Sequence, residues 1–202
     1  MKKQLQGMKR ICKYEEIRNE MIKIDGFKKI IELLFSNNNT DYLPELLETL
    51  LLFLSTKSNL VLFNHFQGFA KTIEILTNSS SEYQFRILKF YKKFIKYSNL
   101  NLKIAQAIGI LAEAANFLSS KNPSLSSISC SILIIFAEQN KLPAELILPF
   151  LSNLSFSTLP FHNRFAIYHL INLFPNPSGS LSPLFFHCFI LLTPLPRADP
   201  PL

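Results

Sequence analysis

Five cationic side chains lie close together near residue 90 of this 202-residue chain, in a stretch where Glu82 is the one acid. On an α-helix, at about 100° per residue, they would fall within an arc of about 120°. A stripe of one sign, with no interleaved glutamate to pair with it, favours acidic ligands. The alternative is a solvated, lysine-rich face that only favours solubility. The five residues are Arg86, Lys89, Lys92, Lys93 and Lys96.

Residue types that often catalyse reactions or bind metals form no motif in this sequence. The four histidines, His65, His162, His169 and His187, have no Cys or His partners at metal-ligand spacing. A glycine-rich phosphate loop, a G-x-S-x-G elbow and a paired-carboxylate motif are all missing. We therefore expect no enzymatic activity, no catalytic residue, no metal site and no cofactor.

The charge is distributed unevenly along the chain. Residues 1–103 hold 17 Lys/Arg and 10 Asp/Glu, whereas residues 104–202 hold four of each, so the net charge of +7 comes from the first half. Such a field favours an acidic partner. A second basic cluster lies at the amino terminus, where it could be a targeting signal, a contact for nucleic acid or lipid, or simply a mobile basic terminus. It comprises Lys2, Lys3, Lys9, Arg10 and Lys13.

The helix that would carry the basic stripe belongs to an internal repeat. Gly26, Gly68 and Gly109 open similar segments at nearly equal intervals along the chain. Residues 26–34 and 68–76 share Gly, Phe, Lys, Ile, Glu and Leu at matching positions, and an Asn- and Ser-containing break follows each. The interval falls within the period of about 40 to 47 residues that is typical of stacked helical repeats.

A long apolar helix follows each polar break. The apolar residues of 42–54 recur at the same relative positions in 83–95, with the spacing of a helix that buries one face. Residues 110–138 form a looser third copy, and residues 142–174 form a degraded fourth copy. Three phenylalanines stand in register on these long helices, Phe53, Phe94 and Phe136. We predict that they belong to the core; the alternative is that they line an aromatic groove.

This order of short helix, glycine, middle helix, polar break and long helix over residues 14–174 resembles the armadillo repeat family, with the HEAT repeat as the close alternative. The resemblance implies an all-α, right-handed superhelix with about three clear repeats and one degenerate repeat. The third helices of an armadillo protein line a concave groove, so the basic stripe would lie where partners bind. We expect the glycine to permit the sharp turn between the first two helices, since glycine tolerates positive φ and close backbone approach.

The resemblance does not extend to recognition of basic nuclear-localisation peptides. Armadillo proteins of the nuclear-import type carry a Trp and, four residues later, an Asn on the third helix. The matching Asn positions here are Phe53, Phe94 and Phe136, and the matching Trp positions are Thr49, Phe90 and Ile132. We therefore expect a non-enzymatic scaffold or adaptor that holds an acidic partner segment. The alternatives are a nuclear-transport-type adaptor, or binding of nucleic acid or anionic lipid through the basic first half.

The predicted organisation has three parts: a basic extension at residues 1–13, the repeat domain at 14–174 and an irregular tail at 175–202 that holds seven of the twelve prolines. The apolar run at 184–193 is too short to span a bilayer, so we expect no transmembrane segment. The tail could pack on the open end of the solenoid, or the chain could be part of a longer one. Three widely spaced cysteines, Cys12, Cys130 and Cys188, predict reduced thiols and a cytoplasmic or nuclear location.

Overall fold

The computed structural model describes residues 2–36 and 42–139, and every regular element in these ranges is a helix, as the sequence predicts. The expected fourth repeat and the proline-rich tail lie outside the described residues. The elements are α1 (Lys2–Ile11), α2 (Glu15–Lys23), α3 (Gly26–Phe35), α4 (Leu43–Phe53), α5 (Lys57–His65), α6 (Gly68–Asn78), α7 (Ser81–Phe94), α8 (Asn99–Ala107), α9 (Ile110–Asn116), the 3-10 turn η1 (Phe117–Ser119) and α10 (Pro123–Glu138).

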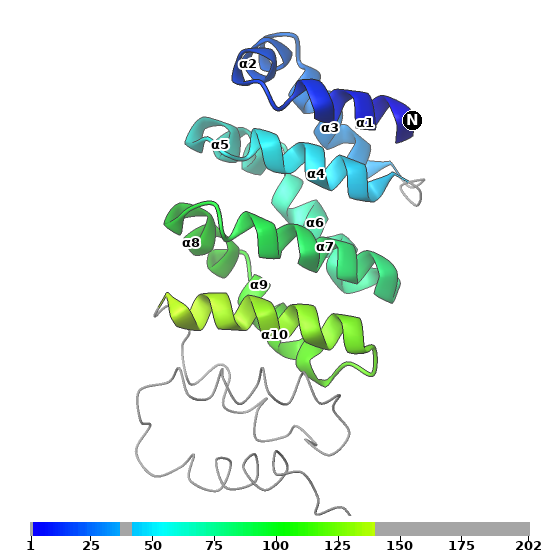
Figure 1. The fold of residues 1–202 in the computed structure, drawn as a ribbon, viewed down its shortest axis with the longest axis vertical. Coiled ribbons are helices and arrows are strands. Elements are labelled where there is room, and N and C mark those ends of the chain that lie inside the picture. Colours follow the sequence, from blue (N-terminus) through cyan, green and yellow to red (C-terminus); the bar gives the residue numbers. More distant parts are fainter. Residues whose placement is uncertain (1, 37–41, 140–202) are drawn as a thin grey trace, which may run out of the picture. The chain divides into compact units, whose positions relative to one another are not determined.

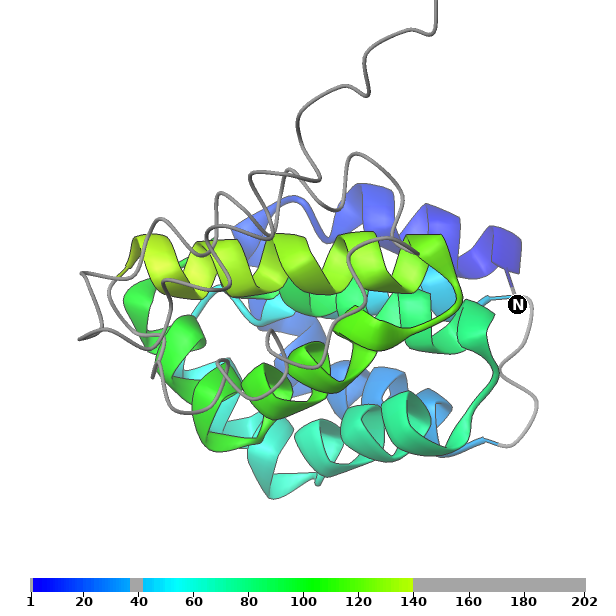
Figure 2. The same cartoon turned by 90° about the horizontal axis from the view of Figure 1, so that it is seen from below.

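The chain divides into two compact units, residues 1–110 and 111–202, and the first contains α1 to α8. Within this unit the order of short, middle and long helix occurs twice, as α2–α3–α4 and as α5–α6–α7. Helices α1, α4 and α7 run side by side in one row, α1 against α4 and α4 against α7 (Figure 1). The middle helices α3 and α6 pack together in a second row, which lies below α1 in Figure 2.

Residues 2–11, which we expected to be part of a basic extension, form helix α1 and pack against α4. Leu5 and Cys12 are buried, whereas Lys2, Lys3 and Gln4 are exposed. Burial raises the pKa of the Cys12 thiol. This amphipathic pattern fits a helix that covers the apolar side of α4 and presents its polar side to solvent.

In the turn between the short and middle helices, one residue adopts a positive φ and the glycine after it permits close packing. Asp25 and Gln67 adopt the positive φ, 56° in each case, and the glycine that follows begins the next helix. A Cβ at Gly68 would lie 2.3 Å from a ring atom of Phe63, so the glycine there permits close packing. In the third copy Gly109 itself takes the positive φ, of 89°, at the position equivalent to Gln67. The expected glycine register is therefore shifted by one residue in the third copy.

The long helices bury the phenylalanines that the sequence places in register. Phe53, Phe94 and Phe136 are each 0% exposed, which confirms their assignment to the core. Around Phe94 the rings of Phe69 and Phe90 lie 5.7 and 6.0 Å away, centroid to centroid. Such aromatic pairs stabilise a core beyond the apolar area that they bury.

The short helices close the carboxyl ends of the long helices that precede them. Asn59 of α5 donates from Nδ2 to the carbonyl of Phe53, at 2.8 Å, and Asn101 of α8 donates to the carbonyl of Phe94, at 3.1 Å. Both amides are buried. Because the last carbonyls of a helix have no partner within it, a buried side-chain donor there removes the cost of leaving them unpaired. Arg18 of α2 likewise donates to Cys12 O and Lys13 O, beyond the end of α1.

The second unit contains most of α9, with η1 and α10. Helix α10 begins at Pro123, and the Asn122 side chain accepts hydrogen bonds from the backbone N–H groups of Ser124 and Leu125. This is the cap expected for an Asn-Pro pair at a helix start. Within the unit, the Ser126 hydroxyl donates to the carbonyl of Leu118 at 2.9 Å and ties α10 to η1.

Candidate basic pocket between α4 and α7

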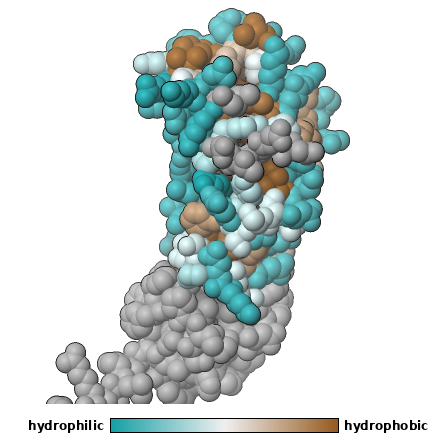
Figure 3. Space-filling view, turned by 90° about the vertical axis from the view of Figure 1, so that its right-hand side faces the viewer, coloured by the Kyte–Doolittle hydropathy of each residue, from teal (hydrophilic) through white to brown (hydrophobic). Residues whose placement is uncertain are grey.

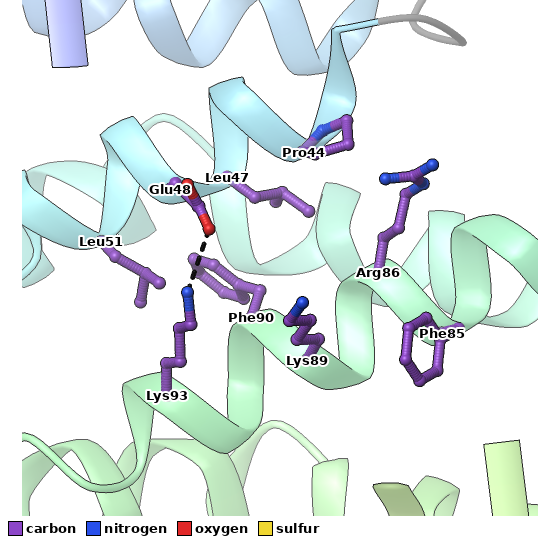
Figure 4. A pocket seen from close by; sticks show the side chains of 9 residues that line it. All are labelled: Pro44, Leu47, Glu48, Leu51, Phe85, Arg86, Lys89, Phe90 and Lys93. Carbon is purple, nitrogen blue, oxygen red and sulfur yellow. Dashed lines mark hydrogen bonds and ion pairs between the residues drawn. The ribbon is translucent and has the colours of Figure 1, made fainter. Parts of the chain in front are cut away.

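A pocket lies between α4 and α7 in the first unit, on the row formed by the long helices (Figure 4). Its volume is about 80 Å³. Five apolar residues and one carboxylate line it together with three cations. The apolar residues are Pro44, Leu47, Leu51, Phe85 and Phe90, the carboxylate is Glu48, and the cations are Arg86, Lys89 and Lys93.

Three of the five predicted stripe residues therefore line the pocket. The periodicity of α7 explains this, because residues three and four apart share a helix face. Lys96 is exposed and does not line the pocket, and Lys92 is half-buried and does not line it either. Desolvation by burial, together with the charge of nearby Lys96, lowers the pKa of Lys92.

The three cations at the pocket differ in their partners. Lys93 Nζ lies 3.0 Å from Glu48 Oε1, across the gap between α7 and α4 (Figure 4). Arg86 Nη2 lies 2.5 Å from Glu82 Oε1, one turn earlier on α7. Lys89 is exposed and makes no ion pair with any residue in the described ranges. Arg86 Nε is buried and has no hydrogen-bond partner within those ranges.

Glu48 is shared between two lysines from two helices. Besides Lys93 of α7, it pairs with Lys9 of α1. The hydrogen bond from Lys9, followed by that from Lys93 and by the charges of both ammonium groups, lowers the pKa of this carboxyl, although partial burial opposes the shift. Glu48 is therefore a carboxylate at neutral pH and balances part of the positive charge of α7.

The charges around the pocket still sum to a positive value. Four cations, Lys9, Arg86, Lys89 and Lys93, lie with two carboxylates, Glu48 and Glu82, so these six groups have a net charge of +2. On the side of the molecule drawn in Figure 3, hydrophilic side chains cover most of the described surface and hydrophobic ones form small separate patches. The pocket therefore combines a small apolar lining with cations, and it favours an anionic ligand.

The size of the pocket limits what it can hold. Small-molecule sites usually enclose about 300–1,000 Å³, and 80 Å³ is well below that range. A pocket of this size does not enclose a whole small molecule, so a partner would reach it with individual side chains. Within the described ranges no three His, Cys, Asp or Glu side chains gather as metal ligands. The same ranges contain no helix that is both long and apolar enough to span a bilayer.

The sequence did not link Glu48 or Lys9 to the basic stripe of α7. They lie on α4 and α1, far from Lys93 in the sequence, and no local pattern links them to it. In the sequence, Lys9 belongs to the amino-terminal basic cluster, and Glu48 lies in a predicted helix in which only the apolar residues form a pattern. Comparison of the chain with protein-family models, curated proteins and solved structures gave no match.

Proposed function

We propose that this protein is a non-enzymatic scaffold that binds an acidic segment of a partner protein across α4 and α7. One observation carries the proposal: the basic stripe of α7 is not an isolated solvated face, because Arg86, Lys89 and Lys93 line a pocket with Leu47, Leu51 and Phe90 of two long helices. A cationic surface with an apolar lining suits a peptide segment, whose side chains supply both carboxylates and apolar groups.

The repeat supports the same proposal. We infer that the chain is an armadillo-like, right-handed superhelix in which the long helices line the concave groove. The regular recurrence of positive φ at Asp25, Gln67 and Gly109 supports this inference, as does the packing of α1, α4 and α7 in one row. A cytoplasmic or nuclear location is consistent with Cys12 and Cys130, which are buried and form no disulfide within the described ranges.

Binding of nucleic acid or anionic lipid through the basic first half is the second candidate. It is favoured by the exposed cations Lys2, Lys3 and Arg10 of α1, which are in addition to those of the pocket. This candidate predicts affinity that falls steeply with salt and depends little on the sequence of the ligand. A peptide site with an apolar lining predicts a weaker dependence on salt and a strong dependence on sequence.

The proposal can be tested with a charge-reversal variant of the stripe, provided that the variant leaves intact the ion pairs that stabilise the fold. Reversal of Arg86 or Lys93 would place like charges beside Glu82 or Glu48. Lys89→Glu combined with Lys96→Glu avoids both pairs and changes the stripe by four charge units. Lys57→Glu combined with Lys103→Glu is the matched control, because both lysines are exposed on α5 and α8, away from the pocket.

Affinity purification from a cell extract, with quantitative mass spectrometry, would compare the three proteins at two salt concentrations. Circular dichroism would verify that each remains helical. We expect specific proteins to be lost with the stripe variant and retained with the control. Recovery of the same partner proteins in equal amounts by the wild type, the stripe variant and the control would contradict the proposal. Recovery of nucleic acid instead of protein would favour the second candidate.

A further inference from the structure

Glu48 occupies the position where a ligand carboxylate would be expected to bind. It lines the pocket, its Oε1 is 3.0 Å from Lys93 Nζ, and it reaches Lys93 from the opposite helix (Figure 4). Lys89, one turn earlier on α7, has no such partner in the part of the chain that the structure describes. Of the three cations that line the pocket, Lys93 and Arg86 are therefore paired within the protein, and Lys89 is available to a ligand.

We propose that Glu48 competes with the ligand for Lys93. When an acidic segment binds, one of its carboxylates replaces Glu48 on Lys93, and a second carboxylate binds Lys89. This inference rests on the proposed function and adds how the site is regulated and which partner it selects. The exchange is feasible because Glu48 keeps its second partner, Lys9 of α1, when it releases Lys93. An exposed ion pair such as Lys93–Glu48 is weak, so a ligand can replace it at small cost.

The geometry of α7 sets the spacing of the two ligand carboxylates. Lys89 and Lys93 are four residues apart, which is about 6 Å along a helix at 1.5 Å per residue. In an extended peptide, side chains on one face recur every second residue, or about 6.6–6.8 Å. The site should therefore select an extended segment with acidic side chains at alternate positions rather than at adjacent ones.

The charged groups that face Glu48 can be named for each neighbouring helix. Helix α1 supplies Lys9, and helix α7 supplies Lys93, with Lys89 and Arg86 farther along the pocket. On α4 itself Glu45 lies one turn away, where it pairs with Lys2 and accepts a hydrogen bond from Gln6. Removal of the Glu48 charge thus leaves Lys9 and Lys93 without a carboxylate and adds positive potential at the pocket.

The test uses two fluorescein-labelled decapeptides of identical composition, one with four glutamates at alternate positions and one with the same glutamates in adjacent pairs. Fluorescence anisotropy gives their dissociation constants for the wild type. We expect the alternate peptide to bind more tightly, and Glu48→Gln to raise its affinity by about two- to fivefold, the range that an exposed ion pair contributes. Lys89→Glu should abolish this binding, and Lys103→Glu should leave it unchanged.

A double-mutant cycle shows whether Glu48 acts through Lys93. The gain from Glu48→Gln should disappear when Lys93 is changed to Gln. Lys9→Gln removes the ion pair between Lys9 and Glu48, so that Glu48 pairs with Lys93 alone. This variant should therefore lower the affinity for the peptide or leave it unchanged. If Glu48 only fastened α1 to α4, then Glu48→Gln and Lys9→Gln would change the affinity in the same direction.

The possible failures are separable. If the alternate peptide binds and depends on Lys89, but Glu48→Gln brings no gain in a protein that circular dichroism shows to be folded, the competitor role is overturned and the acidic site remains. If the two peptides bind equally, the selected spacing is wrong. If neither peptide binds to the wild type or to Glu48→Gln, the acidic site itself fails, and the inference fails with it.

Discussion

Gly68 lies directly against the ring of Phe63, so that a Cβ at this position would be 2.3 to 2.5 Å from three ring atoms. Phe63 is 0% exposed and packs edge-on against Phe69, with ring centroids 4.7 Å apart. The ring is therefore enclosed in the core, and a shift of the ring would disturb its contact with Phe69. This contact joins α5 to α6 and fixes the turn between them, which lies along the chain between α4 and α7, the two helices that line the pocket.

Gly68→Ala should accordingly destabilise the protein by about 1–3 kcal/mol, the usual cost of overpacking a core, and Gly68→Val should cost more. Gly7→Ala is the matched control, because Gly7 lies within α1 and nothing is within 4 Å of its Cβ position. That variant should be neutral or should stabilise the protein by up to about 1 kcal/mol, the helix preference of Ala over Gly. Urea unfolding followed by circular dichroism measures both, and equal stability of the two variants would contradict the turn geometry.

Phe94→Ala should destabilise the protein by about 3–5 kcal/mol. The ring is 0% exposed and lies among Phe69, Phe90 and Tyr91, so its removal leaves a cavity as well as a loss of apolar burial. Tyr97→Ala, three residues on at a side chain that is 52% exposed, should cost less than about 1 kcal/mol. If Phe94→Ala left the free energy of unfolding unchanged in the same experiment, the assignment of this ring to the core would be wrong.

Asn59→Ala should cost about 1–3 kcal/mol, because the carbonyl of Phe53 would remain buried without its donor. The exposed Asn64 on the same helix provides the control, and Asn64→Ala should have little effect. Asn101→Ala should cost less than Asn59→Ala, because the carbonyl of Phe94 also accepts a hydrogen bond from the backbone N–H of Tyr97 and would keep that donor. Hydrogen exchange should show faster opening at the carboxyl end of α4 in the first variant and of α7 in the second. If Asn64→Ala accelerated the exchange at the end of α4 as much as Asn59→Ala does, the buried Asn side chains would not be what stabilises the helix ends.

Tyr91→Phe should reduce the loss of stability at alkaline pH. The Tyr91 hydroxyl is buried and donates to Thr72 Oγ1 at 2.6 Å, because Thr72 Oγ1 itself donates to Phe69 O. Burial raises the pKa of Tyr91 above its ordinary value of about 10. Stability tied to the neutral hydroxyl is therefore complete below pH ~10 and declines above it, where the unfolded chain releases the proton first.

The measurement for Tyr91→Phe is urea unfolding between pH 7 and 11. At pH 7 the variant should be less stable by about 0.5–1.5 kcal/mol through the lost hydrogen bond. Above pH ~10 its stability should fall less steeply than that of the wild type. The thiols of Cys12 and Cys130, whose pKa values burial also raises, to about 12 for Cys130, are present in both proteins and cancel in the comparison. Parallel pH profiles would contradict the assignment.

Much of the local structure was readable from the sequence. The apolar spacing around Phe53 and Phe94 predicted long helices with one buried face, because a helix that packs on a core must repeat its apolar residues every three or four positions. Both phenylalanines are fully buried, as expected. Arg86, Lys89 and Lys93 were correctly placed on one helix face by the same periodicity, and they line the pocket.

The tertiary structure decided which groups meet from different helices. Glu48 pairs with Lys9 and Lys93, which are distant from it in the sequence, and this depends on how α1, α4 and α7 pack. The close approach of Phe63 likewise explains why Gly68 is a glycine although Gln67 takes the positive φ. A periodic pattern indicates which face of a helix is buried, because the helix repeat determines which side chains share a face and the apolar ones mark the face that packs. It cannot report the partner across an interface, because that depends on the positions of whole helices in space.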